Sequence, residues 1–106
     1  MSTTPDFIEY VCDQIAGVGA LRHKKMFGDY MVYVRDKPAL LVCDNTVFVK
    51  QLEALATEMK NASIGIPYPG AKPHYILDID DAEFSKKIIR MLEPLLSLPK
   101  PRKKKL

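Results

Sequence analysis

Two histidines and two cysteines are the side chains of this sequence best suited to bind a metal ion. They are His23, His74, Cys12 and Cys43. A zinc site needs three or four ligands at short recurring spacings, such as a Cys-x-x-Cys pair, and these four residues are scattered. We therefore expect no metal and no other cofactor. Both thiols are expected to be reduced and to pack as small apolar side chains.

A cluster of carboxylates is the next candidate for chemistry. Asp78, Asp80, Asp81 and Glu83 could exchange protons or bind magnesium. The spacing of a calcium loop is missing, and helix capping by Asp80 and Glu83 already explains two of the four. The serines lack a nucleophile elbow, and the loop over residues 64–73 lacks the spacing of a phosphate loop. We predict no catalytic residue and no enzyme; an enzyme of unrecognised type is the alternative.

The end of the sequence is strongly basic. The net charge of the 106 residues is +3. Residues 1–96 hold eleven basic and thirteen acidic side chains, or −2, so the basicity belongs to residues 97–106. Such a tail can bind the phosphates of DNA or RNA, and it can equally be a disordered, solvated segment. The candidate nucleic-acid-binding residues are Lys100, Arg102, Lys103, Lys104 and Lys105.

The composition predicts one domain over residues 1–96, followed by the basic tail. The 47% hydrophobic content is that of a globular chain that can bury a core. No apolar run approaches the roughly 20 residues of a membrane span, and the N-terminus lacks an export signal. We expect a cytoplasmic protein that makes no membrane contact.

Three short apolar runs predict strands over residues 30–34, 39–43 and 46–49. Asp36-Lys37 and Asp44-Asn45 lie between them as two-residue turns, which indicates an antiparallel meander. With these turns, Val34 faces Ala39, Val32 faces Leu41 and Val42 faces Val47. Both faces of the sheet are then apolar, so helices cover both faces or a second subunit covers one. A homodimer is the corresponding prediction.

Helical patterns flank the meander. Thr3 to Asp6 predicts a capped helix start before an apolar stripe of Phe7, Val11 and Ile15. A second, short helix is expected over residues 52–59, and a strand over residues 75–79. A third helix is expected to begin with Asp80 as its cap and to end near Glu93, because Pro94 follows. The predicted fold is α+β and two-layered, with an antiparallel sheet of about four to six strands in the order α-β-β-β-β-α-β-α.

The meander also carries a family resemblance. Its residues are Lys25-Met26-Phe27-Gly28, Tyr30, Tyr33, Ala39-Leu40 and Val47-Phe48-Val49-Lys50. They resemble the N-terminal domain of the TfoX/Sxy family, whose pattern is a basic residue, Met-Phe-Gly-Gly, an aromatic residue, a turn, Phe-Ala-Leu, a second turn and Leu-Tyr-Leu-Lys. The similarity extends loosely over residues 6–96. Asp29 replaces the usual second glycine, and Val47-Phe48-Val49 replaces Leu-Tyr-Leu.

The resemblance implies a fold similar to secretion-chaperone-like α/β proteins and a bacterial, non-enzymatic binding module. Well-known TfoX members regulate competence for DNA uptake, and they act at promoters with the cyclic-AMP receptor protein. They also carry a C-terminal domain, for which these 106 residues leave no room. The expected function is therefore regulation of transcription through protein contacts, with nucleic-acid binding by the tail as the alternative. The family-motif contact candidates are Lys25, Met26, Phe27, Gly28, Asp29, Tyr30 and Lys50.

Overall fold

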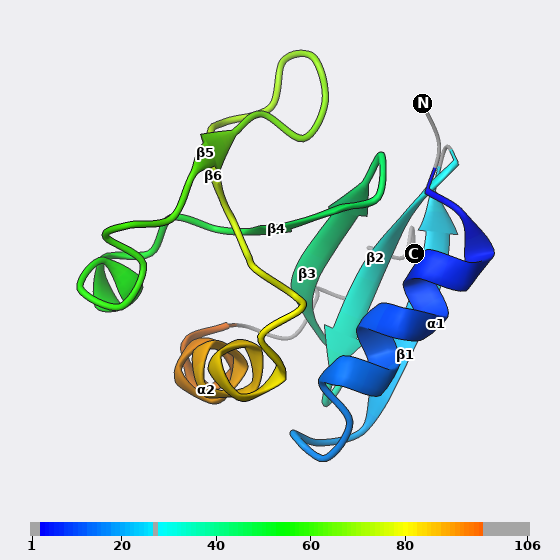
Figure 1. The fold of residues 1–106 in the computed structure, drawn as a ribbon, viewed down its shortest axis with the longest axis horizontal. Helices are drawn as coiled ribbons and strands as arrows, with labels where there is room; N and C mark the ends of the chain where they lie inside the picture. Colours follow the sequence, from blue (N-terminus) through cyan, green and yellow to red (C-terminus); the bar gives the residue numbers. More distant parts are fainter. Residues whose placement is uncertain (1–2, 27, 97–106) are drawn as a thin grey trace, which may run out of the picture.

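A computed structural model describes residues 3–26 and 28–96 as two helices, six strands and two short 3-10 helices (Figure 1). The helices are α1 (Pro5–Gln14) and α2 (Ala82–Leu92), and the 3-10 helices are η1 (Glu53–Leu55) and η2 (Glu93–Leu95). The strands are β1 (Leu21–Met26), β2 (Asp29–Val34), β3 (Lys37–Cys43), β4 (Thr46–Val49), β5 (Ile64–Gly65) and β6 (His74–Ile76).

All six strands join one antiparallel sheet in the order β1-β2-β3-β4-β6-β5. The first four follow one another along the chain as a meander, and β6 then pairs with β4. The fold class predicted from the sequence is confirmed: the protein is α+β, with an N-terminal and a C-terminal helix. The described residues contain no helix that is both long and apolar enough to cross a bilayer.

The two turns of the meander have left-handed backbone angles. Arg35 and Asp36 have φ values of 52° and 67°, and Asp44 and Asn45 have φ values of 52° and 55°. Two successive positive φ angles are typical of the tight hairpin turns that match the twist of a sheet. The second turn lies where the sequence predicted it. The first was predicted at Asp36-Lys37 and is one residue earlier, so Lys37 already belongs to β3.

This shift changes the register between β2 and β3. Val34 pairs with Lys37 and Val32 with Leu40, so the predicted pairs with Ala39 and Leu41 were wrong, whereas Val42 does face Val47. The register also shifts between Val32 and Tyr33, where Ala39 is left without a partner as in a β-bulge. The turn and the bulge could not be placed from alternation alone because both strands are apolar at almost every position.

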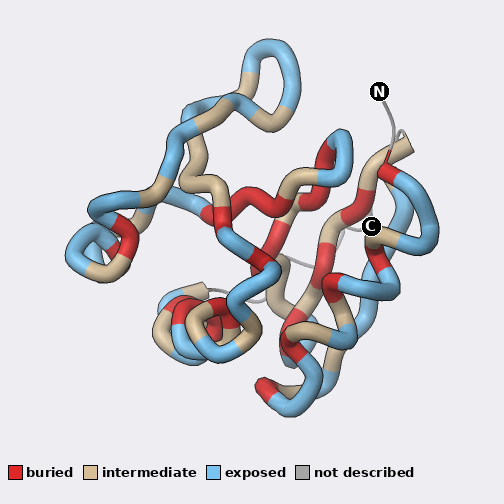
Figure 2. The backbone as a smooth tube through the Cα atoms, in the orientation of Figure 1, coloured by how far each residue is buried: buried red, intermediate tan, exposed pale blue. Residues whose placement is uncertain are grey.

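The observed register places the buried valines of the meander on one face of the sheet. Buried and partly exposed positions alternate along β2 (Figure 2). That face shares one buried cluster with both helices, so the helices lie on one side of the sheet rather than on both. The strand members of the cluster include Tyr30, Val32, Val34, Leu40, Val42, Val47 and Val49; the helical members are Ile8, Val11, Ile88, Ile89 and Leu92.

Both helices have the expected apolar stripes, and one start differs from the prediction. The Thr4 hydroxyl caps α1 by accepting a hydrogen bond from the N–H of Phe7 at 3.2 Å. Helix α2 is capped by Asp81, whose carboxylate accepts from the N–H of Phe84 at 3.1 Å, and not by Asp80. Helix α2 ends at Leu92, and Pro94 lies in the 3-10 turn that follows, as its missing N–H predicted.

The predicted middle helix is reduced to the short 3-10 helix η1 and a series of turns up to residue 61. Leu52 precedes η1 and gives it no side-chain cap. The N–H groups of Leu55 and Ala56 bond to carbonyls three residues earlier, which is the 3-10 pattern. The apolar spacing was nevertheless informative, because Leu55 and Met59 are fully buried in the core.

Candidate functional site

The residues of the TfoX-like pattern lie where β1 meets β2: Lys25 and Met26 end β1, and Asp29 and Tyr30 begin β2. Met26 pairs with Asp29 to close the hairpin, and Gly28 has a φ of 87°, which an L side chain rarely adopts. Lys25 is exposed, whereas the side chain of Tyr30 is buried and packs against the His23 ring in an edge-to-face arrangement. Phe27 lies outside the described residues.

Asp29 connects this hairpin to the N-terminal segment and to the turn between β3 and β4. Its carboxylate accepts hydrogen bonds from the Thr3 hydroxyl at 3.0 Å and from the N–H of Asp44 at 3.1 Å. The Thr3 side chain, which is 4% exposed, also accepts from the N–H of Asn45 at 3.2 Å. The Thr3 N–H in turn donates to the carbonyl of Gly28 at 3.1 Å. Gly28 and Asp29 therefore have a structural function here.

The structure does not bring all the motif residues together. Lys25 pairs with Tyr30, and through β2 and β3 this row continues to Val42 and Val47. Lys50 follows three residues after Val47, so it lies roughly 10 Å further along the sheet and three strands away from Lys25. Lys50 lies instead on a groove of the opposite sheet face.

That groove is on the helix-free face of the sheet. Met31 and Leu41 pair with each other, and Leu41 pairs with Phe48, so the three side chains form an apolar row across β2, β3 and β4. The loop over residues 66–73 borders the row, and a groove of about 320 Å³ lies between them. Lys50, Lys72 and His74 contribute polar groups to its lining, and the Tyr68 side chain is 55% exposed.

A second, more open groove lies on the helix side of the sheet. It has a volume of about 690 Å³ and is lined by parts of α1, β4, the turn after η1, and the segment leading into α2. Its lining includes four carboxylates: Glu58, Asp78, Asp80 and Asp81. The acidic cluster noted in the sequence thus faces solvent in a broad depression.

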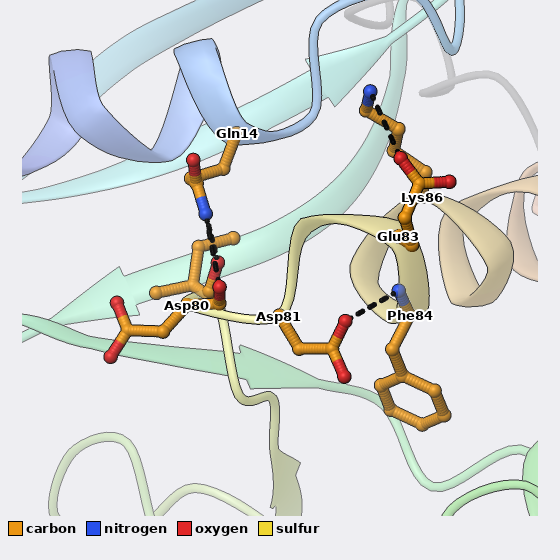
Figure 3. A network of polar contacts seen from close by, with 7 residues as sticks. Gln14, Asp80, Asp81, Glu83, Phe84 and Lys86 are labelled. Atoms are coloured by element: carbon orange, nitrogen blue, oxygen red, sulfur yellow. Dashed lines mark hydrogen bonds and ion pairs between the residues drawn. The ribbon is translucent and has the colours of Figure 1, made fainter.

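The contacts of these carboxylates are structural (Figure 3). Asp81 caps α2. Gln14 of α1 donates to the carbonyl of Ile79 at 2.9 Å, which joins α1 to the segment before α2. Glu58 pairs with Lys87 at 2.7 Å. Asp80 accepts a hydrogen bond from the Tyr10 hydroxyl, and that bond raises the pKa of Tyr10 above its ordinary value.

The candidate metal and thiol residues are not assembled into a centre. Across the described residues, no three His, Cys, Asp or Glu side chains lie close enough to hold a metal ion. Cys43 is buried at the end of β3 and Cys12 is partly buried in α1, both as free thiols. Burial raises the pKa of the Cys43 thiol to about 11, with Asp29 and Asp44 adding to the effect, and burial also raises the pKa of Cys12.

Strand β1 is a charged element whose basic run was not predicted from the sequence, apart from Lys25 as a motif residue. Arg22, His23, Lys24 and Lys25 are consecutive and all exposed. The signal was present in the sequence as three cations and a histidine in a row, within residues 1–96, whose net charge is −2. The predicted nucleic-acid-binding residues Lys100, Arg102, Lys103, Lys104 and Lys105 lie outside the described residues.

Comparison with known proteins shows which family the chain belongs to. No protein-family model matches the chain. The "Uncharacterized 12.7 kDa protein in trpE 5'region" of Spirochaeta aurantia is 35% identical over 107 aligned positions, which cover 99% of this chain and 93% of that protein. Identity at this level over nearly the full length of both chains reflects common ancestry. This chain therefore belongs to the same family as the 12.7 kDa protein of Spirochaeta aurantia.

Proposed function

We propose that the protein is a small, non-enzymatic binding module that acts through protein–protein contacts. Its role would resemble that of the N-terminal domain of TfoX/Sxy regulators of transcription and competence. The observation that carries the proposal is the apolar groove on the helix-free face, formed by Met31, Leu41 and Phe48.

The groove has the composition of a protein contact site. Interfaces have an apolar centre, aromatic anchors and a polar rim. Here Leu41 and Phe48 supply the centre, Tyr68 is an exposed aromatic side chain beside it, and Lys50 and Lys72 lie at the rim. A groove of about 320 Å³ accepts one or two apolar side chains of a partner, which is how interface anchors bind. The carboxylates of the other groove, in contrast, already serve helix capping and ion pairing.

Because the sequence resembles TfoX/Sxy regulators, the cyclic-AMP receptor protein is the first partner to test. We expect calorimetric titration of that receptor with the wild-type chain to give a measurable complex. Leu41→Glu, which places a charge in the groove, should weaken binding at least about tenfold.

Leu95→Glu is the matched control. Leu95 is 53% exposed in η2, outside the groove, and its substitution should leave the affinity within about twofold of wild type. Equal loss in both variants would rule out the groove as the contact surface. If wild-type protein with a native circular dichroism spectrum gave no heat of binding, this partner would be rejected. The homodimer expected from the sequence stays a prediction, checked by sedimentation at micromolar concentration.

A further inference from the structure

Strand β1 is an edge strand with unused hydrogen-bonding capacity. Within the described part of the chain, β1 pairs with β2 alone and forms one end of the sheet (Figure 1). Its six residues are paired with β2 in an unbroken register, so no bulge interrupts the edge along the length of the strand. Long edge strands are templates for pairing with further chains.

The direction of each backbone group can be derived from one hydrogen bond. The N–H of Arg35 donates to the carbonyl of Ala20 at 2.8 Å, and residues 20 and 35 are opposite each other in the register. In an antiparallel pair, bonded and non-bonded pairs alternate. Arg22 and Lys24 therefore bond to β2, whereas the N–H and C=O groups of Leu21, His23 and Lys25 point toward the open edge.

The side chains of the same strand place positive charge on both faces of that edge. Arg22 and Lys24 lie on the helix-free face, opposite Tyr33 and Met31. The Arg22 guanidinium is held by Asp36 at 3.1 Å and lies 4.2 Å from the centre of the Tyr33 ring. His23 and Lys25 lie on the other face, opposite Val32 and Tyr30. All four side chains are exposed.

This charge distribution determines which kind of chain can pair with β1. A second copy of the chain, added edge to edge through β1, would place the same cations opposite one another, and like charges directly across strands are destabilising. An extended segment with consecutive acidic residues would instead place opposite charges next to each other on both faces of the sheet, because successive side chains of a strand alternate between its faces. Its carboxylates would lie beside Arg22 and Lys24 on one face and beside His23 and Lys25 on the other.

We propose that β1 is a docking site for an acidic, extended segment of a partner protein, which adds to the sheet as a seventh strand. Main-chain hydrogen bonds from Leu21, His23 and Lys25 supply the register, and the cations supply the preference for acidic sequence. An acidic segment of this kind would be one partner of the binding module proposed above, so this inference rests on that proposed function. The edge is tested with a peptide and the groove of Met31, Leu41 and Phe48 with a protein, so one proposal can be rejected while the other stands.

The test uses the full chain and a synthetic octapeptide with four consecutive glutamates between Val-Thr and Thr-Val ends. Amide hydrogen exchange by NMR is expected to slow at Leu21, His23 and Lys25 in proportion to the bound fraction. The amides of Arg22 and Lys24, already bonded to β2, should change little. The same peptide with N-methyl groups on alternate residues keeps its charge but cannot pair, and its affinity should fall at least about tenfold.

Charge reversal tests the side chains. Lys24→Glu combined with Lys25→Glu should weaken peptide binding about tenfold or more. The matched control, Lys60→Glu with Arg90→Glu, changes the net charge equally at exposed positions outside β1 and should bind within about twofold of wild type.

Three results would overturn the inference. One is equal affinity for the N-methylated peptide, which would indicate simple charge attraction. Another is equal loss of affinity in both double variants. The last is that β1 binds a DNA duplex more tightly than the peptide, with no alternating protection of its amides from hydrogen exchange. That result would make this edge a phosphate-binding surface. The groove variant Leu41→Glu leaves β1 unchanged, so it should bind the acidic peptide as the wild type does. Measuring peptide binding by this variant therefore shows whether a negative result concerns the edge or the groove.

Discussion

The carboxylate of Asp29 joins three segments that are distant in the sequence. It accepts from Thr3, 26 residues away, and from the N–H of Asp44, 15 residues away. In the TfoX-like pattern this position is usually glycine, which has no side chain to make such bonds. Where this sequence differs from the TfoX pattern that it resembles, the chain gains a structural contact.

Replacement of Asp29 by alanine should destabilise the fold by about 1–3 kcal/mol, because the N–H of Asp44 loses its acceptor. The nearly buried hydroxyl of Thr3 loses one of its two acceptors and keeps only the carbonyl of Val42, at 3.2 Å. Urea unfolding followed by circular dichroism measures the change. Glu9→Ala, at an exposed position of α1, is the control and should shift the free energy of unfolding by less than about 0.5 kcal/mol. Equal effects of the two substitutions would show that the Asp29 contacts contribute nothing.

Local capping could be predicted from the sequence, but contacts between distant segments could not. Thr4 was identified as a cap region from its neighbours alone, since a cap bonds to an N–H only three residues away. The burial of Thr3 depends on Asp29, Val42 and Asn45, and their proximity is a product of the whole meander. The exposed basic run of β1 was visible in the sequence, yet only the sheet order showed that it forms an edge.

At the scale of the elements, strands β2, β3 and β4 of the meander were identified by their apolar residues, whereas the charged strand β1 was not. The turn between β3 and β4 was identified by two residues that tolerate positive φ. The registers were predicted less well. Arg35 adopts a φ of 52° although it is not a usual turn residue, and this moved the turn by one position. Pro38 then pairs with Tyr33 at a non-bonded position, where its missing N–H costs no hydrogen bond to β2. The short strand β5 was not predicted, because a two-residue strand leaves no periodic signal.

The start of α2 gives a test at the element scale. Asp81→Ala removes the cap on the N–H of Phe84 and should cost about 1 kcal/mol of stability, measured by thermal or urea unfolding. Asp80→Ala, one residue earlier, removes only an exposed contact with Tyr10 and should cost less than about 0.5 kcal/mol. The reverse order would place the cap at Asp80, as the sequence alone suggested.

Over the whole molecule, charge is distributed unevenly. The edge strand β1 is basic, the groove beside α2 is acidic, and residues 97–106 carry five of the sixteen basic side chains. Removal of residues 97–106 changes the net charge from +3 to −2. Electrostatic attraction to nucleic acid scales with the number of cations that neutralise phosphates, so this segment is the first candidate for such binding.

A salt titration of DNA binding separates the tail from the body. If the tail binds DNA, the full chain should lose affinity steeply as salt is raised, and the chain without residues 97–106 should bind weakly with a flatter dependence. The urea midpoint of unfolding of the shortened chain should stay close to that of the full chain, because the buried apolar residues lie within residues 8–92. Equal and negligible binding by both chains would remove the tail as a nucleic-acid site.

The order of the first four strands has a consequence for how the chain folds. β1 to β4 follow one another with two-residue turns between β2, β3 and β4, so most of their pairings join residues close in sequence. Contacts of short sequence separation cost little loop-closure entropy and form early. The pairing of β6 with β4 and the contact of Gln14 with Ile79 span much longer segments. The meander is therefore expected to be formed in the folding transition state, and the joining of α1 to the segment before α2 to follow it.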